Sequence, residues 1–499
     1  MLADPWSRHR LAPKLVALAL GLTLLAGCAQ PTPASPTGSA SAKPRPFTIA
    51  VLGPVTSVDP ATATSRTDSI LVSNVYQRLM RVAPGTRDLK PDAATDCAFT
   101  SRLTYECTLP NTLRFHNGDV LDSADVSFSL QRLLRMGGSG TSLGLLASLR
   151  RIETPNPQTV RFLLSRPDNQ FGFALAGQAA SIVDRRVYDP DTALPLAVAP
   201  VGSGPFQVTE LSAQGATLHK ASAYVGPTGA QLDELRLAVF ADSLAVEDAI
   251  NTNTIDVAWA GLDPSAQQRL GNEIAVSADH TAHGFTTVSL PGVKVTRLYW
   301  NPASAWRTNK ALRLGVSRAL QTDRSLDSVV PLGVRDRVSA FAVGGRARLP
   351  KLKGKRVLLT LGYQSDDAGQ HDVAQLLRDR IESLDTVSVR LTTSANADLM
   401  LTVSPAWVDN VTGWLQLYTA APLAESRKRL AALDAAARLG TATATAQDVA
   451  AIQKQAAVDN TVLPVSQTNE SLLIGPKVAM SDGNFGSGQQ LGLWGFHRV

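Results

Sequence analysis

Cysteine is almost absent from this chain, whose 499 residues include only Cys28, Cys97 and Cys107. There is no CxxC pair, no Cys/His spacing typical of zinc sites and no HExxH motif. The P-loop and the G-x-G-x-x-G motif are missing as well. The adjacent carboxylates Asp366 and Asp367 fit a solvated turn better than a catalytic pair. We therefore expect a protein that is not an enzyme and that has no cofactor.

Aromatic residues are also scarce, and neither charge is in large excess. Aromatic residues make up 5 % of the chain, charged residues 18 % and hydrophobic residues 44 %. The formal net charge of +6 is small for this length and the basic residues are scattered, so the sequence predicts no nucleic-acid-binding surface. The hydrophobic content is that of an ordinary globular protein, and the length is sufficient for two or three lobes.

The apolar run near the N-terminus, residues 15–26, is shorter than the roughly 20 residues that cross a bilayer. Three basic residues precede it, and the run ends in the small residue Ala26, which Gly27 and Cys28 follow. This order is typical of a secretory signal, which we place at residues 1–27. A cysteine at this point resembles the lipidated first residue of a bacterial lipoprotein. The alternative is an ordinary signal peptide with an incidental cysteine.

Residues 28–46 are rich in proline, serine and alanine and have almost no large apolar side chains. Such a segment cannot build a core, so we predict an extended tether. In polyproline geometry it would reach roughly 50 Å. The protein would then be held at a membrane face through its N-terminal lipid.

The two remaining cysteines, Cys97 and Cys107, flank residues 98–106, which can fold back as a short hairpin. An exported location favours a disulfide between them. Two free buried thiols are the alternative.

From residue 47 onward the pattern is that of a mixed α/β protein with more than one lobe. The clearest unit has strands at 357–361 and 387–391 with a helix between them, which predicts parallel pairing. Strands are also expected at 103–109 and 113–115, and long helices at 422–439 and 448–459.

Local capping signals mark the starts of two further helices. Asp122 or Ser123 is placed to cap one helix, and Asn309 to cap the other.

Four stretches in chain order, residues 115–132, 201–206, 232–259 and 298–324, carry a resemblance to one family. They are similar to sequence blocks of the solute-binding lipoproteins of ABC importers for peptides and nickel. Two departures occur: Asn253 stands where the family usually has glycine, and the segment after Arg324 is short, basic and poor in aromatic residues.

The resemblance implies an α/β fold, a two-lobed periplasmic-binding-protein-like clamshell of class II with an extra subdomain in the first lobe. Lobe I would comprise residues 47–290 and 463–499, with an inserted subdomain at about 79–190, and lobe II residues 291–462. A small solute, most often a short peptide in this family, would lie between the lobes and pass to an ABC permease. We expect a monomer.

The resemblance also implies candidate residues in the segment 404–410. Asp409 would hold the α-amine of a peptide, and Trp407 would form a wall of the pocket. Capping of a helix is the alternative role of Asp409. A carboxylate-binding arginine could be Arg346 or Arg348, and no motif chooses between them.

Further ligand-binding candidates are Gly53 and Thr56 in the loop after the first strand, and Trp300 and Asn301 near the expected hinge. A plain turn is the alternative for the loop, and core packing is the alternative for Trp300.

Three other functions compete with solute delivery. His280 and His283 could bind a metal, because the family includes nickel binders, although such a spacing in a polar stretch is usually solvated. A clamshell that has lost transport could act as a sensor or an envelope-assembly partner. An enzyme is disfavoured because neither a P-loop nor a G-x-G-x-x-G or HExxH motif is present.

Overall fold

The computed structural model of the chain describes residues 45–82, 88–137, 144–259, 262–277, 279–345, 347–352, 356–364, 368–405, 410–481, 485–486 and 490–499. Residues 46–499 form one compact unit. Within the described ranges no helix has both the length and the apolar character to span a bilayer.

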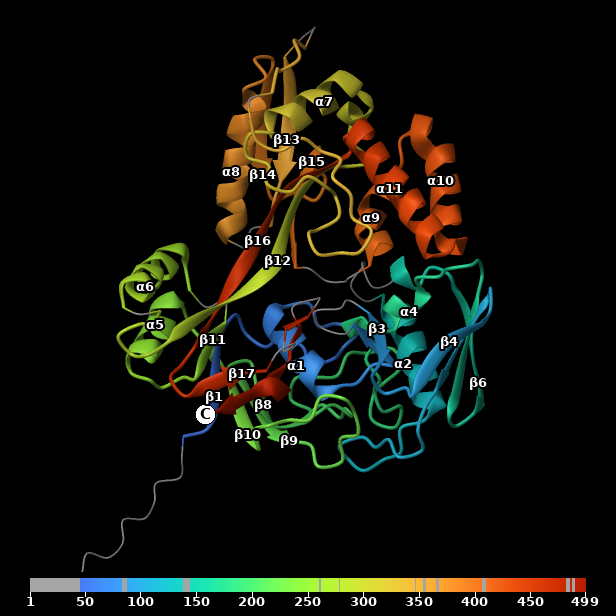
Figure 1. Cartoon of the computed structure of the whole chain (residues 1–499), viewed down its shortest axis with the longest axis vertical. Helices are drawn as coiled ribbons and strands as arrows, with labels where there is room; N and C mark the ends of the chain where they lie inside the picture. Colours follow the sequence, from blue (N-terminus) through green and yellow to red (C-terminus); the bar gives the residue numbers. More distant parts are fainter. Residues whose placement is uncertain are drawn as a thin grey trace, which may run out of the picture. The chain divides into compact units, whose positions relative to one another are not determined.

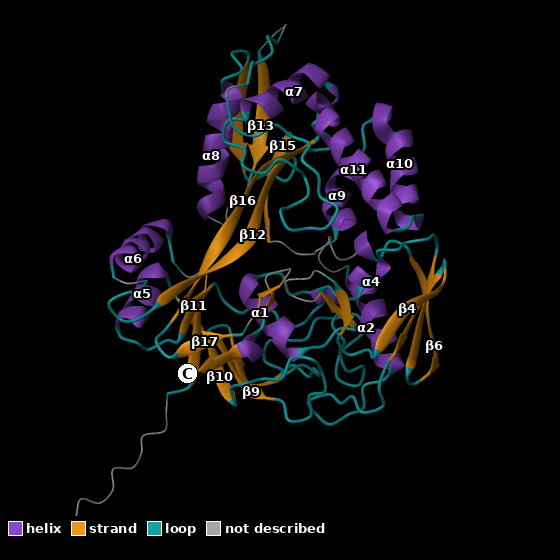
Figure 2. Cartoon of the chain, viewed as in Figure 1, coloured by secondary structure: helices purple, strands orange, loops and turns teal. Residues whose placement is uncertain are grey.

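A ten-stranded sheet runs through this unit, and helices flank it (Figure 2). Two long antiparallel strands, β12 and β16, stand at its centre (Figure 1). In spatial order the strands are β14 (Val387–Thr392), β13 (Val357–Gly362), β15 (Leu399–Pro405), β12 (Thr286–Trp300), β16 (Val462–Ile474), β11 (Val257–Trp259), β1 (Phe47–Leu52), β10 (Glu234–Phe240), β9 (Gly215–Lys220) and β8 (Phe206–Ser212).

Lobe I is the part built on β1 and β8–β11. One core on this sheet contains Ile49, Val51 and residues of helix α1, and a second contains Ala50 with residues of α5 and α6. Alternation along β1 explains the two cores, since successive side chains point to opposite faces. The other elements here are α1 (Arg66–Val75), α5 (Ser243–Asn251), α6 (Pro264–Val276), β17 (Val478–Met480), β18 (Phe485–Gly486), β19 (Gln490–Leu491), η3 (Leu493–Gly495) and β20 (Phe496–Arg498).

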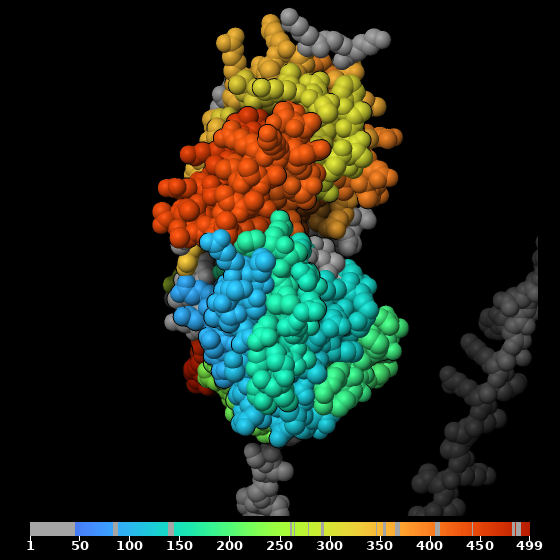
Figure 3. Space-filling view, turned by 90° about the vertical axis from the view of Figure 1, so that its right-hand side faces the viewer, coloured from blue at the N-terminus to red at the C-terminus, as the bar shows by residue number. Residues whose placement is uncertain are grey.

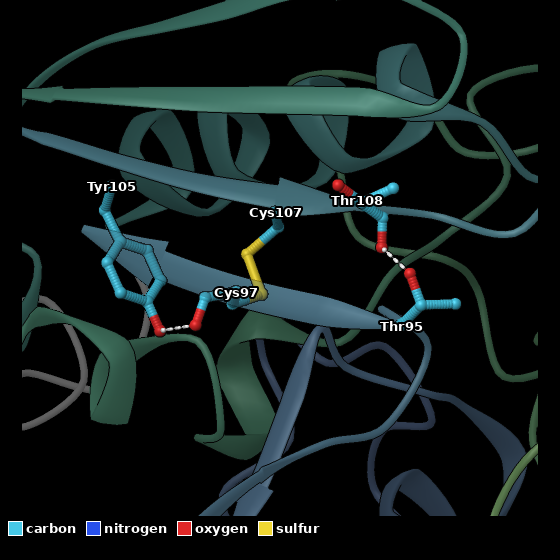
Figure 4. Close-up of a disulfide and its surroundings, with 5 residues drawn as sticks. All are labelled: Thr95, Cys97, Tyr105, Cys107 and Thr108. Carbon is cyan, nitrogen blue, oxygen red and sulfur yellow. Dashed lines mark hydrogen bonds between the residues drawn. A yellow bond between two sulfur atoms is a disulfide. The ribbon is translucent and has the colours of Figure 1, made fainter. Parts of the chain in front are cut away.

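A separate four-stranded antiparallel sheet, in the order β4-β5-β7-β6, packs against helix α2 in lobe I. A disulfide joins Cys97 and Cys107, which are register partners on β4 and β5 (Figure 4), so the predicted pairing is confirmed. The elements of this region are β2 (Met80–Val82), β3 (Leu89–Pro91), β4 (Asp96–Ser101), β5 (Thr104–Thr108), α2 (Ser123–Met136), β6 (Leu149–Asn156), β7 (Thr159–Leu164), α4 (Phe171–Ala174) and η1 (Gln178–Ala180).

Lobe II is the part built on β13–β15, with a single core that also takes in one half of β12 and the start of β16. The strands β13 and β14 pair in parallel around helix α8, as the sequence predicts. The other elements are η2 (Ala305–Thr308), α7 (Lys310–Ala319), α8 (Ala368–Glu382), α9 (Val411–Thr419), α10 (Ala424–Leu439) and α11 (Ala442–Asp459). The residue limits of the lobes given above stay a prediction.

The local signals in the sequence have mixed outcomes. Asn309 caps α7 as predicted, and Asp122 caps α2 by accepting hydrogen bonds from two backbone amides. Asn253, in place of the family's glycine, adopts φ +52°, a left-handed conformation that asparagine tolerates. The predicted strand at 113–115 is wrong: its described pairing is one isolated bridge between Arg114 and Val120.

Candidate ligand-binding site

The two lobes are joined by β12 and β16, and the chain passes between their cores along these strands. Their pairing runs from Thr286 opposite Ile474 to Tyr299 opposite Val462. One end of the pair belongs to the core of lobe I and the other end to the core of lobe II. Such a connection by two strands allows the lobes to rotate about it.

The lobes meet again where the loop before α4 contacts α10 and α11. The carboxylate of Asp168 accepts a hydrogen bond from Nη1 of Arg438 at 2.9 Å and another from the hydroxyl of Ser148 at 2.8 Å. Asp168 is buried, and Arg438 is nearly so. Burial alone would lower the pKa of Arg438, but Asp168 and Asp434 outweigh it and raise that pKa.

Asn169 strengthens this contact through the C-terminal end of α10. Its side-chain amide donates to the carbonyls of Ala437 and Gly440, at 3.0 and 3.1 Å, and its backbone N–H donates to the carbonyl of Arg438. These are carbonyl groups that a helix end leaves without partners of its own. Figure 3 shows the two surfaces in contact, residues of α10 and α11 in orange above lobe I in blue and teal.

A third pair extends the contact, since the amide of Asn410 donates to Gln170 at 2.9 Å. Asn410 also caps α9, which fixes its position. We call this set the interlobe contact; its members are Asp168, Asn169, Gln170, Asn410 and Arg438.

Part of the loop after β1, where we predicted ligand contacts, forms hydrogen bonds within the protein. Gly53 is exposed, has φ +89° and has open space where a side chain would lie. The N–H and hydroxyl of Thr56 both donate to the carboxylate of Asp68, at 2.8 and 2.6 Å. Asp68 belongs to the capping box of α1. The loop is therefore fixed to a helix start, and a role of Gly53 and Thr56 in binding stays a prediction.

The predicted hinge residues have different surroundings. Trp300 is 1 % exposed and belongs to the core of lobe II. The side chain of Asn301 accepts from the N–H of Ala303 at 3.0 Å, which is a local turn contact. A ligand-binding role of either residue stays a prediction.

Several predicted residues lie outside the described residues, namely Trp407, Asp409, Arg346 and Cys28. Arg348 is described and is exposed. His280 and His283 are exposed too, and within the described ranges no group of three or more acidic, histidine or cysteine residues could hold a metal ion.

A cavity of about 460 Å³ lies in lobe II, between the strands β12 and β15 and the helix α9. Among the described residues that line it there is no aspartate or glutamate. Its lining includes two arginines, Arg297 and Arg307, together with Tyr299, Trp300, Pro302, Thr402, Ser404, Gly413, Gln416, Leu417, Ala420, Ala421, Thr461 and Val462.

Sequence reasoning missed both the interlobe contact and Arg297. Asp168 and Arg438 are 270 positions apart, so no local pattern connects them. Arg297 did leave a signal, because it is a charged residue directly before the apolar residues Leu298, Tyr299 and Trp300.

Comparison with known proteins places this geometry in a family. The model of bacterial extracellular solute-binding proteins, family 5 Middle, matches residues 88–343, which is just over half of the chain. The probable D,D-dipeptide-binding periplasmic protein DdpA of Escherichia coli is 22 % identical over 369 residues, 68 % of this chain and 69 % of that protein.

A second curated relative matches a smaller part. The HTH-type transcriptional regulator SgrR of Pectobacterium atrosepticum is 25 % identical over 189 residues, 38 % of this chain and 32 % of the regulator. The chain thus spans about a third of that relative's length.

Solved structures share the fold. DppA from Helicobacter pylori, in complex with peptide STSA, matches with a TM-score of 0.74 and 16 % identity, over 91 % of this chain and 98 % of that one. AgaA from A. tumefacien R10, in complex with agropinic acid, matches with the same score and identity, over 91 % and 99 %. The predicted two-lobed α/β fold of periplasmic binding proteins is therefore confirmed, and the chain belongs to the bacterial extracellular solute-binding proteins of family 5.

Proposed function

We propose that this protein is a lipid-anchored, extracytoplasmic solute-binding protein that captures a short peptide and delivers it to an ABC permease. The observation that carries the proposal is the pair of contacts between the lobes: a hinge of two strands, β12 and β16, and the interlobe contact at some distance along the chain from them. A clamshell that closes in this way encloses a solute and removes its charges from water.

The relatives support the peptide class. DdpA is named as a probable D,D-dipeptide-binding periplasmic protein, and DppA was solved with a bound peptide. A peptide is also a ligand that sheet edges and backbone groups of a cleft can bind without regard to its side chains. Asp409 and Trp407 remain our proposed amine anchor and pocket wall, with Gly53 and Thr56 on the facing lobe.

The N-terminus supports the location. The apolar run at 15–26, the small residues before Cys28 and the proline-rich segment 28–46 fit export, lipidation and a tether. Globomycin, which blocks cleavage of lipoprotein signals, tests this part: the precursor should accumulate, and the Cys28→Ala variant should not carry lipid. A mature protein of unchanged mass after treatment would contradict lipidation.

The binding proposal is tested with the full chain, purified in detergent without denaturation. Native mass spectrometry should detect a bound peptide mixture, and the Asp409→Ala variant should lose it at lower collision energy. Asp263→Ala is the matched control, because Asp263 is an exposed aspartate that caps the helix α6 of lobe I. A protein that carries no ligand and whose melting temperature does not change with peptide pools would contradict peptide capture.

A second candidate is solute sensing without transport, and the similarity to the regulator SgrR favours it. The two functions differ in what deletion does to growth. Loss of transport should abolish growth on the captured peptide as sole source of an essential amino acid. Normal growth of the deletion strain, together with binding of the same peptide by the purified protein, would favour sensing. A rise in melting temperature with Ni²⁺ alone would favour the metal-binding alternative.

A further inference from the structure

Four residues that line the cavity in lobe II each carry a buried polar atom with no hydrogen-bond partner among the described residues. The four atoms are Nε of Arg297, Nε of Arg307, Nε1 of Trp300 and Oγ1 of Thr461. The four residues are each at most 9 % exposed. Buried polar groups are nearly always paired, so an unpaired cluster of this kind needs a reason.

Arg297 is the most deeply desolvated cation among these four residues. Its Nη1 donates to the carbonyl of Trp414 at 3.3 Å, and its guanidinium lies over the ring of that tryptophan at 4.9 Å. No carboxylate within the part of the chain that the structure describes pairs with it in an ion pair. Burial lowers its pKa to about 10, so the side chain is still charged at neutral pH. A buried cation without an opposite charge is strongly unfavourable.

Arg307 adds a second positive charge to the same cavity. One of its Nη atoms donates to the carbonyl of Ala421. Burial lowers its pKa and the neighbouring Arg313 lowers it further, while Asp459 and Glu425 partly oppose this. Those two carboxylates do not line the cavity. The described lining therefore brings two positive side chains and no carboxylate to the cavity.

A buried arginine elsewhere in lobe II shows what a purely structural role looks like. Arg324 is 5 % exposed and lies over the ring of Phe341 at 5.3 Å. Its guanidinium donates to the carbonyls of Pro464, Ala342 and Ser317, and none of its nitrogen atoms is left unpaired. Burial lowers its pKa to about 10 as well. Arg297 shares this burial and this stacking but not the satisfied hydrogen bonds.

We propose that the cavity is a binding site for the carboxylate of a small organic acid. Arg297 would pair with the carboxylate, with Arg307, Trp300 and Thr461 as the further donors. The side chains of Leu417 and Val462 would contact the apolar part of the acid. The volume suits a molecule of this size. The carboxylate belongs either to the captured solute, which rests on the proposed function, or to a separate organic acid.

The test compares two probes of nearly the same size and shape, the anion phenylacetate and the uncharged phenylacetamide. The full chain in detergent is titrated at pH 7 by calorimetry, with tryptophan fluorescence as a second readout because Trp300 lines the cavity. Phenylacetate should bind, and the affinity for the uncharged amide should be lower by about tenfold or more. Equal affinities for the two probes, or no binding of either, would overturn the proposal without any variant being made.

Variants then assign the charge. Arg297→Met should abolish binding of phenylacetate, and Arg297→Lys should weaken it by about tenfold, since a point charge does not offer the two parallel donors of arginine. Arg324→Met is the matched control and should leave the affinity unchanged. Loss of binding in both methionine variants, or in neither, would contradict the role of Arg297.

A competition experiment distinguishes the two possible sources of the carboxylate, the captured solute and a separate acid. Phenylacetate that displaces the co-purified peptide in native mass spectrometry assigns the site to the solute. Phenylacetate that binds beside the retained peptide assigns it to a separate acid. A protein that binds no peptide but still distinguishes phenylacetate from its amide would contradict the proposed function and support this site.

Discussion

Arg132 and Arg78 in lobe I are buried in a different way from Arg297 and Arg324 in lobe II. In lobe I the guanidinium of Arg132 forms two hydrogen bonds to the carboxylate of Asp59, at 2.8 and 2.6 Å, and Arg78 faces Asp92 at 3.9 Å. In lobe II the guanidinium groups of Arg297 and Arg324 contact backbone carbonyls and aromatic rings, as Arg132 also does, but form no ion pair with a described carboxylate. The first two arginines thus form pairs with no net charge, whereas the other two keep their positive charge in the interior.

The difference has a physical consequence for ligands. A carbonyl satisfies the N–H groups of an arginine, but its dipole does not cancel a full charge. A region that gathers several such arginines keeps a positive interior and attracts an anion, whereas a paired region does not. We therefore expect the charge of lobe I to serve folding and part of the charge of lobe II to serve binding.

The largest effect is expected from breaking the pair in lobe I. Asp59→Asn keeps the shape of the side chain and leaves Arg132 buried without its opposite charge. The free energy of unfolding, measured in urea, should fall by about 3–5 kcal/mol. Asp191→Asn is the control, because the pair Arg135–Asp191 is exposed and its loss should cost less than about 1 kcal/mol. Similar losses in the two variants would show that burial does not set the difference.

A somewhat smaller effect is expected from removing the disulfide between Cys97 and Cys107, which lies in lobe I alone. Replacing both cysteines by serine frees a loop of sequence separation 10 and should lower stability by about 2–3 kcal/mol. Hydrogen exchange should speed up in β4 and β5 and stay unchanged in β13. Equal acceleration in β13 would mean that the lobes unfold as one unit, which would weaken the comparison.

The substitutions Arg324→Met and Arg297→Met should have different effects on stability. Arg324→Met leaves carbonyls of Pro464, Ala342 and Ser317 without a donor, so stability should fall by about 1–3 kcal/mol. Arg297→Met removes a buried charge that has one carbonyl partner, so thermal stability should stay the same or rise. The melting temperatures of both variants, recorded without any added carboxylate, check this order. A larger loss for Arg297→Met would contradict an unbalanced charge at that position.

The parts of the fold that the sequence predicted are those with local causes. The strands predicted at 357–361 and 387–391 carry a short apolar pattern around a helix, and Asn309 stands directly before the helix that it caps. The interlobe contact has no such cause, since it joins Asp168 to Arg438 across most of the chain. Burial of Arg297 depends on how α9 packs over β12, and a sequence pattern does not contain that information.

The wrong prediction of a strand at 113–115 also shows what a sequence pattern does not contain. The segment 113–115 has apolar residues in a strand-like order, and Leu113 and Phe115 are buried in the subdomain core. Its backbone, however, pairs with a neighbour only through the bridge of Arg114 to Val120 among the described residues. The apolar order there reflects the burial of side chains and does not require a strand.

The smallest effect concerns pH, and it again distinguishes the lobes. In lobe I, His116 is partly buried, its Nε2 lies 2.9 Å from the carbonyl oxygen of Gly204, and its buried Nδ1 has no partner among the described residues. Burial lowers its pKa below the ordinary value of 6.5, and the bond to Gly204 opposes this only partly. The unfolded chain therefore binds a proton at this residue more readily than the folded one. Its contribution to stability is complete above pH 6.5 and is lost progressively as the pH falls below it.

The variant His116→Gln keeps an N–H donor for Gly204 and does not titrate. Urea unfolding at several pH values between 7.5 and 5.5 should show a steeper loss of stability for the wild type than for the variant. The buried arginines of lobe II cannot produce this difference, because burial lowers the pKa of Arg297 and Arg324 only to about 10. Hydrogen exchange at pH 5.5 should accordingly report the loss in lobe I and not in β13. Parallel pH profiles for the two proteins would mean that His116 is protonated equally in the folded and unfolded states.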